Sequence, residues 1–218
     1  MISCYPPAKY GADILAERLK RQHLYLPGSF DYREIKEEIQ RLIHALRIEK
    51  NVSSNDLEAF FDREITLCED AFRHAKTVIG DTPIVLDYLF HPRPLGLAKI
   101  LLEHGFQVTA VYLDSISPEE KSAFDWLKTY HPDLELRATI QVKMRVLPRS
   151  SEIRTLAIGQ KAAWFSGSRN FVNMVQGGGL WGFDGIRRTL ELMTEAFFEE
   201  KDPRDLIVRK GWGCESCI

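Results

Sequence analysis

Residues 84–94 read IVLDYLFHPRP, an apolar run that leads into a Pro-Arg-Pro turn. A continuous apolar strand of this kind is typical of a parallel sheet covered on both faces. Short apolar runs recur after it and alternate with helical segments, which predicts right-handed parallel crossovers. We therefore expect an α/β fold, a Rossmann-like open parallel sheet with helices on both faces.

The same patterns predict the order of elements along the chain. We expect strands at 84–90, 107–113, 135–140, 155–158 and 170–175. Helices are predicted at 94–104, 118–130 and 160–165, with a short turn around 149–154. A helical lead-in precedes them, with helices at 8–21, 31–50 and 55–79, the last with Ser54 as its N-cap. We divide the chain into a helical segment, 1–80, and a Rossmann-like domain, 81–218, that ends in a helix and a tail.

Composition narrows the function classes. The 218 residues contain 29 Lys plus Arg and 31 Asp plus Glu, spread along the chain, which disfavours a dedicated nucleic-acid binder. No apolar run approaches the length of a membrane span, and the first residues do not resemble a signal peptide. We expect a cytoplasmic protein, whose four cysteines do not form the framework of a secreted disulfide protein.

Loops that follow the strands supply the first candidate ligand-binding residues, because ligands of open parallel sheets bind at the carboxyl ends of the strands. His91 and Arg93 follow the first strand. Arg93 lies beside the start of a helix, where its positive charge would help to bind an anionic ligand. The alternative is a rigid turn with a solvated arginine. Gly159 and Gln160 follow the fourth strand; Gly159 permits a tight turn, and Gln160 can point into the crevice.

A glycine-rich loop supplies the other candidates. Residues 176–185 read QGGGLWGFDG and precede an amphipathic helix. Gly177, Gly178 and Gly179 allow the backbone to approach a ligand closely, with Trp181 beside them. The loop matches neither a P-loop nor a dinucleotide-binding fingerprint.

The chain ends in a dithiol, Cys214-x-x-Cys217. Two thiolates at this spacing suit an iron–sulfur cluster, zinc or copper(I), but a tetrahedral site needs further ligands. The alternative is a frayed tail with incidental thiols. Cys68 lies on the apolar stripe of the helix predicted at 55–79 and is interpreted as a core residue.

The order of the helical lead-in, the His91-Pro92-Arg93 turn and the Trp181-Gly182-Phe183-Asp184-Gly185 loop resembles component 1 of nitrogenase and its relatives, which include cofactor scaffolds and protochlorophyllide reductases. The resemblance covers about residues 10–198. Subunits of that family are about twice this length, and Val172 stands where their cofactor-binding members have a histidine.

The resemblance implies a component 1-type oxidoreductase-like protein, a truncated member or a fragment. It would hold an iron–sulfur cluster, a related metallocluster or a tetrapyrrole-like ligand at the carboxyl edge of its sheet. It would act as a homo-oligomer or with a paired component 1-type subunit, and with an ATP-dependent iron–sulfur reductase. Alternatives are a non-catalytic metallocluster scaffold or carrier, and a module that binds a small anionic ligand.

Overall fold

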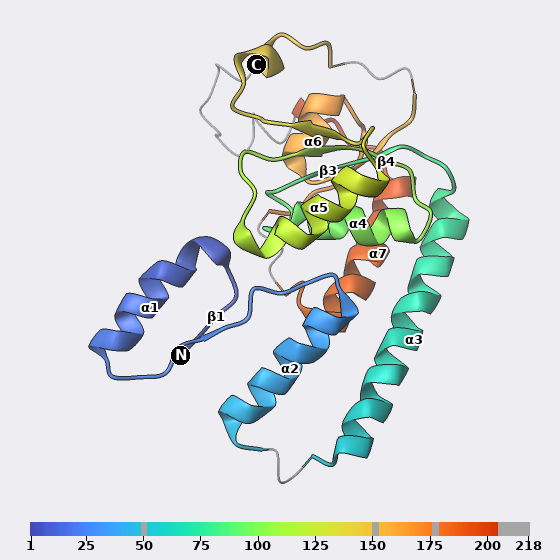
Figure 1. Ribbon diagram of the computed structural model, residues 1–218. Helices are drawn as coiled ribbons and strands as arrows, with labels where there is room; N and C mark the ends of the chain where they lie inside the picture. The colour runs from blue at the N-terminus through green and yellow to red at the C-terminus, as the bar shows by residue number, and fades with distance from the viewer. Residues whose placement is uncertain (49–51, 150–152, 176–178, 205–218) are drawn as a thin grey trace.

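A five-stranded parallel sheet forms the centre of the molecule (Figure 1). The computed structural model describes residues 1–48, 52–149, 153–175 and 179–204. The strand order is β5-β4-β3-β6-β7, and every neighbouring pair is parallel. The strands are β3 (Ile84–Asp87), β4 (Val108–Tyr112), β5 (Glu135–Arg137), β6 (Leu156–Ile158) and β7 (Asn170–Val172). The predicted α/β fold is confirmed, and the strand order reverses between β3 and β6.

Four strands end earlier than predicted, and in β3 and β5 the cause is an aspartate that takes over the backbone N–H groups that would continue the strand. Asp87 Oδ1 accepts hydrogen bonds from the backbone N–H groups of Leu89 (2.8 Å) and Phe90 (3.0 Å), so β3 turns at its last residue. Asp114 Oδ1 accepts from the N–H groups of Thr139 (2.7 Å) and Ile140 (3.2 Å), beyond the end of β5. Both carboxylates therefore lie at the carboxyl edge of the sheet.

Alternate residues of the strands face two different layers of helices. Ile84, Leu86, Val111 and Ile158 belong to the large core, which also contains side chains of α3 (Ser54–Ile79), α4 (Pro94–Glu103), α5 (Lys121–Tyr130) and α7 (Gly182–Phe198). On the other face, Val85, Ala110, Tyr112, Ala157 and Phe171 pack against α6 (Gln160–Ser166) and against Met144 of η4 (Val142–Arg145). Helices thus cover both faces, as the apolar strands predict.

The helical lead-in is packed onto the sheet domain. The apolar stripe of α3, which includes Phe61, Cys68, Phe72 and Ile79, is fully buried. Helix α3 runs alongside α7, with α2 (Tyr32–Leu46) next to them (Figure 1). Ser53, rather than the predicted Ser54, caps α3, because its Oγ accepts the N–H of Asp56 at 3.0 Å. None of the helices within the described residues is long and apolar enough to cross a membrane.

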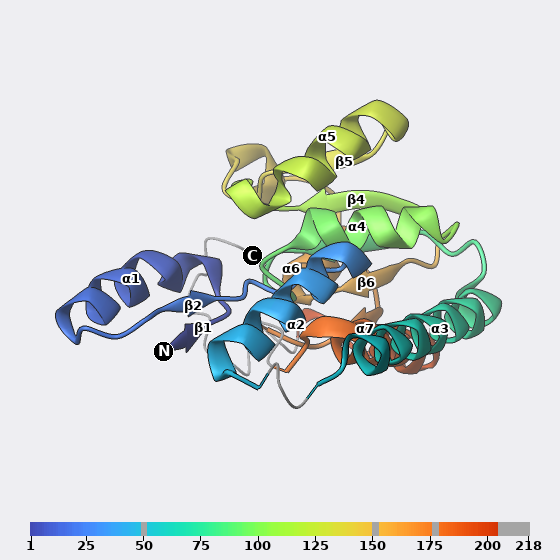
Figure 2. The same cartoon turned by 60° about the horizontal axis from the view of Figure 1, so that its bottom comes forward.

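Residues 1–25 form a small unit beside the carboxyl edge of the sheet (Figure 2). It comprises β1 (Ile2–Ser3), η1 (Pro6–Ala8), α1 (Lys9–Arg18) and β2 (Leu24–Tyr25), with β1 and β2 paired in parallel. His23 holds the unit together: its Nε2 is 2.7 Å from Ser3 Oγ and its Nδ1 is 2.6 Å from Asp13 Oδ1. Tyr25 joins it to the main body by donating its hydroxyl to Glu119 Oε1 at 2.8 Å. We call residues 1–25 the N-terminal unit.

Candidate functional site

The crevice at the topological switch point, between β3 and β6, is occupied by the protein's own carboxylate. Asp87 is buried at the end of β3, and its Oδ2 accepts the backbone N–H of Ala162, in the first turn of α6, at 2.7 Å. Gly159 adopts a φ of +113°, and a Cβ at this position would collide with the Asp87 carboxylate. Because Gly159 has no side chain, the tight turn predicted there leaves room for the Asp87 carboxylate.

Burial raises the pKa of Asp87 to about 6, although hydrogen bonds from the surrounding backbone N–H groups offset part of this increase. Gln160, the residue after Gly159, is also buried, and its Nε2 donates to Asn173 Oδ1 at 2.7 Å. Gly159 and Gln160 thus lie at the predicted edge of the sheet, and their described contacts are with the protein itself. A role for them in binding a ligand stays a prediction.

Arg93 points into the protein. Its side chain is only 5% exposed, which rules out the solvated arginine considered as the alternative. One guanidinium nitrogen donates to the carbonyl of Gly28 and to Glu34 Oε2, both at 2.7 Å, and the other donates to the carbonyl of Glu119 at 2.8 Å. Arg93 therefore links three segments of the chain. These contacts favour a structural role over the predicted anion site.

His91 is equally enclosed. Its Nδ1 accepts the backbone N–H of Arg93 at 3.1 Å, and its ring packs edge-on against Phe30. Burial, reinforced by the Arg93 cation, lowers the pKa of His91 to about 4. A neutral, buried imidazole in this position fixes the turn after β3.

The glycine-rich loop is described in part. Gly177 and Gly178 lie outside the described residues, as do Cys214 and Cys217. Gly179 has a φ of +84° and open space around it. Trp181 is the N-cap residue of α7, and its ring lies against Gly28, where an added Cβ would be 3.3 Å from the indole. The described end of the loop therefore packs against the turn that Arg93 holds.

A cleft of about 560 Å³ lies in front of this edge, between the N-terminal unit and the loops that follow β3 and β4. Its volume falls in the range of small-molecule sites. The N-terminal unit contributes Tyr5, Pro6, Pro7, Lys9, Tyr10 and Asp13. The main body contributes Tyr88, Pro92, Pro94, Asp114, Ser115, Ser117, Pro118 and Glu119. Tyrosine and proline rings thus form most of the wall, and charged groups lie at a few positions.

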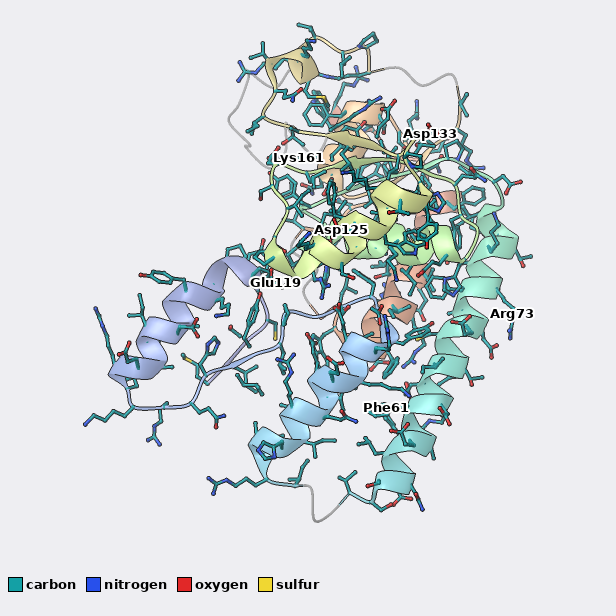
Figure 3. All side chains as sticks on the ribbon, viewed as in Figure 1. Phe61, Arg73, Glu119, Asp125, Asp133 and Lys161 are labelled. Carbon is teal, nitrogen blue, oxygen red and sulfur yellow. The ribbon has the colours of Figure 1, made fainter. Side chains whose placement is uncertain are left out.

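Behind the cleft, one side chain of α6 and three side chains from the loops after β3, β4 and β5 form one network. Lys161 Nζ donates to Tyr88 Oη at 2.5 Å and to Thr139 Oγ1 at 2.9 Å, and lies 3.7 Å from Asp114 Oδ2. The same ammonium lies 4.6 Å from the centre of the Tyr88 ring. Figure 3 labels Lys161 on the sheet domain and Glu119 where the N-terminal unit meets the loop before α5. The network fixes Tyr88 and Asp114 in the cleft wall.

The described residues do not fit a metal centre. Within the described residues, no group of three or more His, Cys, Asp or Glu side chains is arranged to hold a metal ion. Cys68 donates to the carbonyl of Phe183 at 3.5 Å inside the core, and burial raises the pKa of its thiol to about 11.

The residues that form the cleft carry only a weak signal in the sequence. Asp87 and Asp114 each end an apolar strand, and a carboxylate at that position could have been recognised as an edge residue. The tyrosines of the N-terminal unit had no signal, because their place beside β3 and β4 depends on tertiary docking.

Comparison with solved structures identifies the fold. The chain superimposes on a structure titled "Nitrogenase Cp1 at pH 6.5" with a TM-score of 0.57 and 16% sequence identity, over 93% of this chain and 44% of that one. The chain has a nitrogenase-like fold. It spans less than half the length of the nitrogenase chain that it matches. No protein-family model matches the sequence, and no curated protein matches it. At 16% sequence identity, this similarity shows the fold alone.

Proposed function

We propose that this chain is a ligand-binding module of nitrogenase-like fold, and that its ligand occupies the cleft between the N-terminal unit and the loops after β3 and β4. The observation that carries the proposal is the cleft itself, about 560 Å³ in volume and located at the carboxyl edge of the sheet. Ligands of open parallel sheets bind at this edge. Because the switch point is filled by Asp87, the space for a ligand is displaced toward the loops of β3 and β4.

A binding role fits the side chains of the site better than catalysis by this chain alone. Lys161, Tyr88, Thr139 and Asp114 are held by one another, and His91 is buried and neutral. Such fixed groups orient a ligand. Free thiols at Cys4 and Cys68 suit a reducing compartment, so we place the protein in the cytoplasm.

The test is a screen of small organic compounds of all charge types, in which the protein's thermal stability is measured with and without each compound. A ligand that binds the folded state raises the melting temperature. Ser115 is exposed in the cleft wall, so Ser115→Trp should fill the cleft and abolish the shift. Thr129→Trp, on the exposed side of α5, should leave the shift unchanged. A shift that survives Ser115→Trp would contradict the proposed site.

The nitrogenase-like fold favours a second candidate, a metallocluster carrier or a component 1-type oxidoreductase subunit. It would bind an iron–sulfur cluster through Cys214 and Cys217. Two thiolates leave a four-coordinate metal half-liganded, so a second copy or a paired subunit would complete the site, and an ATP-dependent reductase would supply electrons.

Anaerobic reconstitution with iron and sulfide tests this candidate. It predicts a thiolate-to-iron charge-transfer band that is lost in the double variant Cys214→Ser/Cys217→Ser and retained in Cys4→Ser, which changes an exposed thiol at the other end of the chain. The same spectrum from all three proteins would exclude these two cysteines as ligands and leave the cleft proposal ahead.

A further inference from the structure

The cleft combines aromatic faces with carboxylates. Tyr5 and Tyr10 line it from the N-terminal unit, and Tyr88 lines it from the opposite wall. The face of an aromatic ring carries partial negative charge and attracts cations within about 6 Å of its centre. Rings on both walls offer such faces to whatever lies between them.

The charged groups of the wall add to this preference. Three carboxylates line the cleft, those of Asp13, Asp114 and Glu119, against one ammonium group, that of Lys9. Asp13 is paired with Lys9 at 2.7 Å, and Asp114 lies 3.7 Å from Lys161. Among the described residues, no lysine or arginine forms an ion pair with the Glu119 carboxylate, and the nearby Arg93 guanidinium donates to the backbone carbonyl of the same residue. Its Oε1 accepts from Tyr25, while its Oε2 is buried without a hydrogen-bond partner.

The protein already binds one of its own ammonium groups in this way. Lys9 Nζ lies 5.6 Å from the centre of the Tyr25 ring while it pairs with Asp13, so a tyrosine ring and a carboxylate together hold an ammonium. Lys161 differs, because its Nζ donates to the hydroxyl of Tyr88 at 2.5 Å and lies beside Asp114. Glu119, with Tyr5 and Tyr10 in the same cleft, offers a carboxylate and tyrosine rings, and no described lysine is paired with it.

We propose that the ligand of the cleft is an organic cation, an amine or quaternary ammonium compound whose charged nitrogen lies between the tyrosine rings and Glu119. The inference rests on the proposed function, in that it takes the cleft to be the binding site. With Asp13 and Asp114 paired with lysines, the Glu119 carboxylate leaves the wall with a negative charge that disfavours small anions. The proline rings of the wall accommodate the apolar body of the cation.

Three probes of similar size separate charge from shape: benzyltrimethylammonium, its neutral carbon analogue neopentylbenzene, and the anion phenylacetate. Binding is followed by heteronuclear NMR on the intact chain. We expect chemical-shift changes at Tyr5, Tyr10 and Tyr88 with the cation, and affinity at least about tenfold weaker for the other two, a factor that corresponds to about 1.4 kcal/mol.

Two variants and one control locate the cation. Glu119→Gln should weaken binding of the cation about tenfold and leave the neutral analogue unaffected. Tyr10→Leu, a change at a residue that is 78% exposed, should preserve the fold and should also weaken binding of the cation selectively. Asp133→Asn removes an exposed carboxylate that does not line the cleft, near the far end of α5, and should change neither (Figure 3).

The outcomes separate this inference from the proposed function. If neopentylbenzene or phenylacetate binds in the cleft as tightly as the cation, the cleft does not prefer a positive charge. The same follows if both Glu119→Gln and Tyr10→Leu bind the cation with wild-type affinity. In either case the cleft remains a binding site. If none of the three probes perturbs the cleft tyrosines and the compound screen also finds no ligand for the cleft, the proposed function itself is wrong.

Discussion

Arg93 shows how one buried side chain can hold several segments of this fold in place. Its guanidinium satisfies the carbonyls of Gly28 and Glu119 and pairs with Glu34 of α2. These partners belong to the turn before α2, to η3 (Pro118–Glu120) and to the first turn of α2. Because a lysine offers a single point charge instead of a planar fork, it could not reach all three groups.

We predict that Arg93→Ala lowers the free energy of unfolding by about 3 kcal/mol, since an unsatisfied buried acceptor costs on the order of 1–3 kcal/mol. Chemical denaturation measures this loss. Arg33→Ala serves as the control, because the Arg33 side chain is 89% exposed, and its effect should stay within about 0.5 kcal/mol. Equal losses from the two variants would mean that the contacts of Arg93 contribute nothing to the stability of the fold.

Glu120 couples the stability of the fold to pH. The side chain is buried, and its Oε1 accepts the N–H of Gly96 in the first turn of α4 at 2.9 Å. Burial raises the pKa of Glu120 from 4.5 to about 7. Between these two values the unfolded chain has released the proton while the folded chain retains it. The unfolded state then binds fewer protons, so the contribution of Glu120 to stability falls as the pH rises.

We predict that Glu120→Gln removes this dependence. The difference in unfolding free energy, variant minus wild type, should increase by up to about 3 kcal/mol between pH 4.5 and pH 8, because each pKa unit corresponds to about 1.4 kcal/mol. His91, with a pKa lowered to about 4, acts in the opposite direction at the acid end in both proteins and cancels in the difference. Denaturation at a series of pH values tests this, and parallel profiles would refute it.

At the scale of elements, the turn from β6 into α6 requires a glycine at position 159. The Asp87 carboxylate occupies the space that a Cβ of residue 159 would need, and the backbone there has a positive φ. A side chain at this position therefore faces both backbone strain and a collision.

We predict that Gly159→Ala destabilises the protein by more than about 2 kcal/mol, as expected for strain combined with overpacking of a buried site. Gly105→Ala is the matched control. Its φ of +76° is also positive, but nothing lies within 4 Å of an added Cβ. Gly159, with a φ of +113° and a ψ of 162°, has a backbone conformation that is almost restricted to glycine. The excess loss of stability in Gly159→Ala, measured by denaturation, reports this additional strain together with the collision with Asp87. Equal losses would show that neither adds to the cost of a positive φ.

The type and order of the elements of the main sheet and its helices could be predicted from sequence because each depends on local periodicity, whereas the short pair β1–β2 was not predicted. Apolar runs such as Ile84–Leu86 and the stripe through Phe61 and Phe72 identify buried strands and a buried helix face directly. The ends of the strands could not be predicted in the same way. They are set where the carboxylates of Asp87 and Asp114 capture backbone N–H groups, in the second case 25 residues away along the chain.

The candidate site was less predictable than the fold for a related reason. The sequence correctly located the loops at the carboxyl edge, since parallel strands bring their ends together. It could not show that Arg93 and His91 turn inward, because their partners lie in segments far away in sequence, such as Gly28 and Phe30. Nor could it show that Tyr5 and Tyr10 line the cleft.

At the scale of the whole molecule, the cleft exists because the N-terminal unit docks beside the sheet domain. Tyr25 makes a direct side-chain link between them, through its hydroxyl and Glu119 Oε1, and Arg41 of α2 donates to the carbonyl of Tyr25 at 3.3 Å. The unit has its own internal hydrogen bonds through His23, so we expect it to move as one piece. The cleft should therefore widen when the link to Glu119 is lost.

We predict that Tyr25→Phe loosens the N-terminal unit and leaves the sheet domain unchanged. A single hydrogen bond of this kind contributes about 0.5–1.5 kcal/mol, which is small against global stability but corresponds to a several-fold change in local opening. Native-state hydrogen exchange should show faster exchange of the α1 amides and of the β1–β2 pair, with β3 and β4 as internal references. Tyr130→Phe, a change at an exposed tyrosine of α5, is the control. If α1 exchanges at the same rate in Tyr25→Phe and in the wild type, the cleft is held by the packing of the unit as a whole, and the Tyr25–Glu119 hydrogen bond is not what closes it.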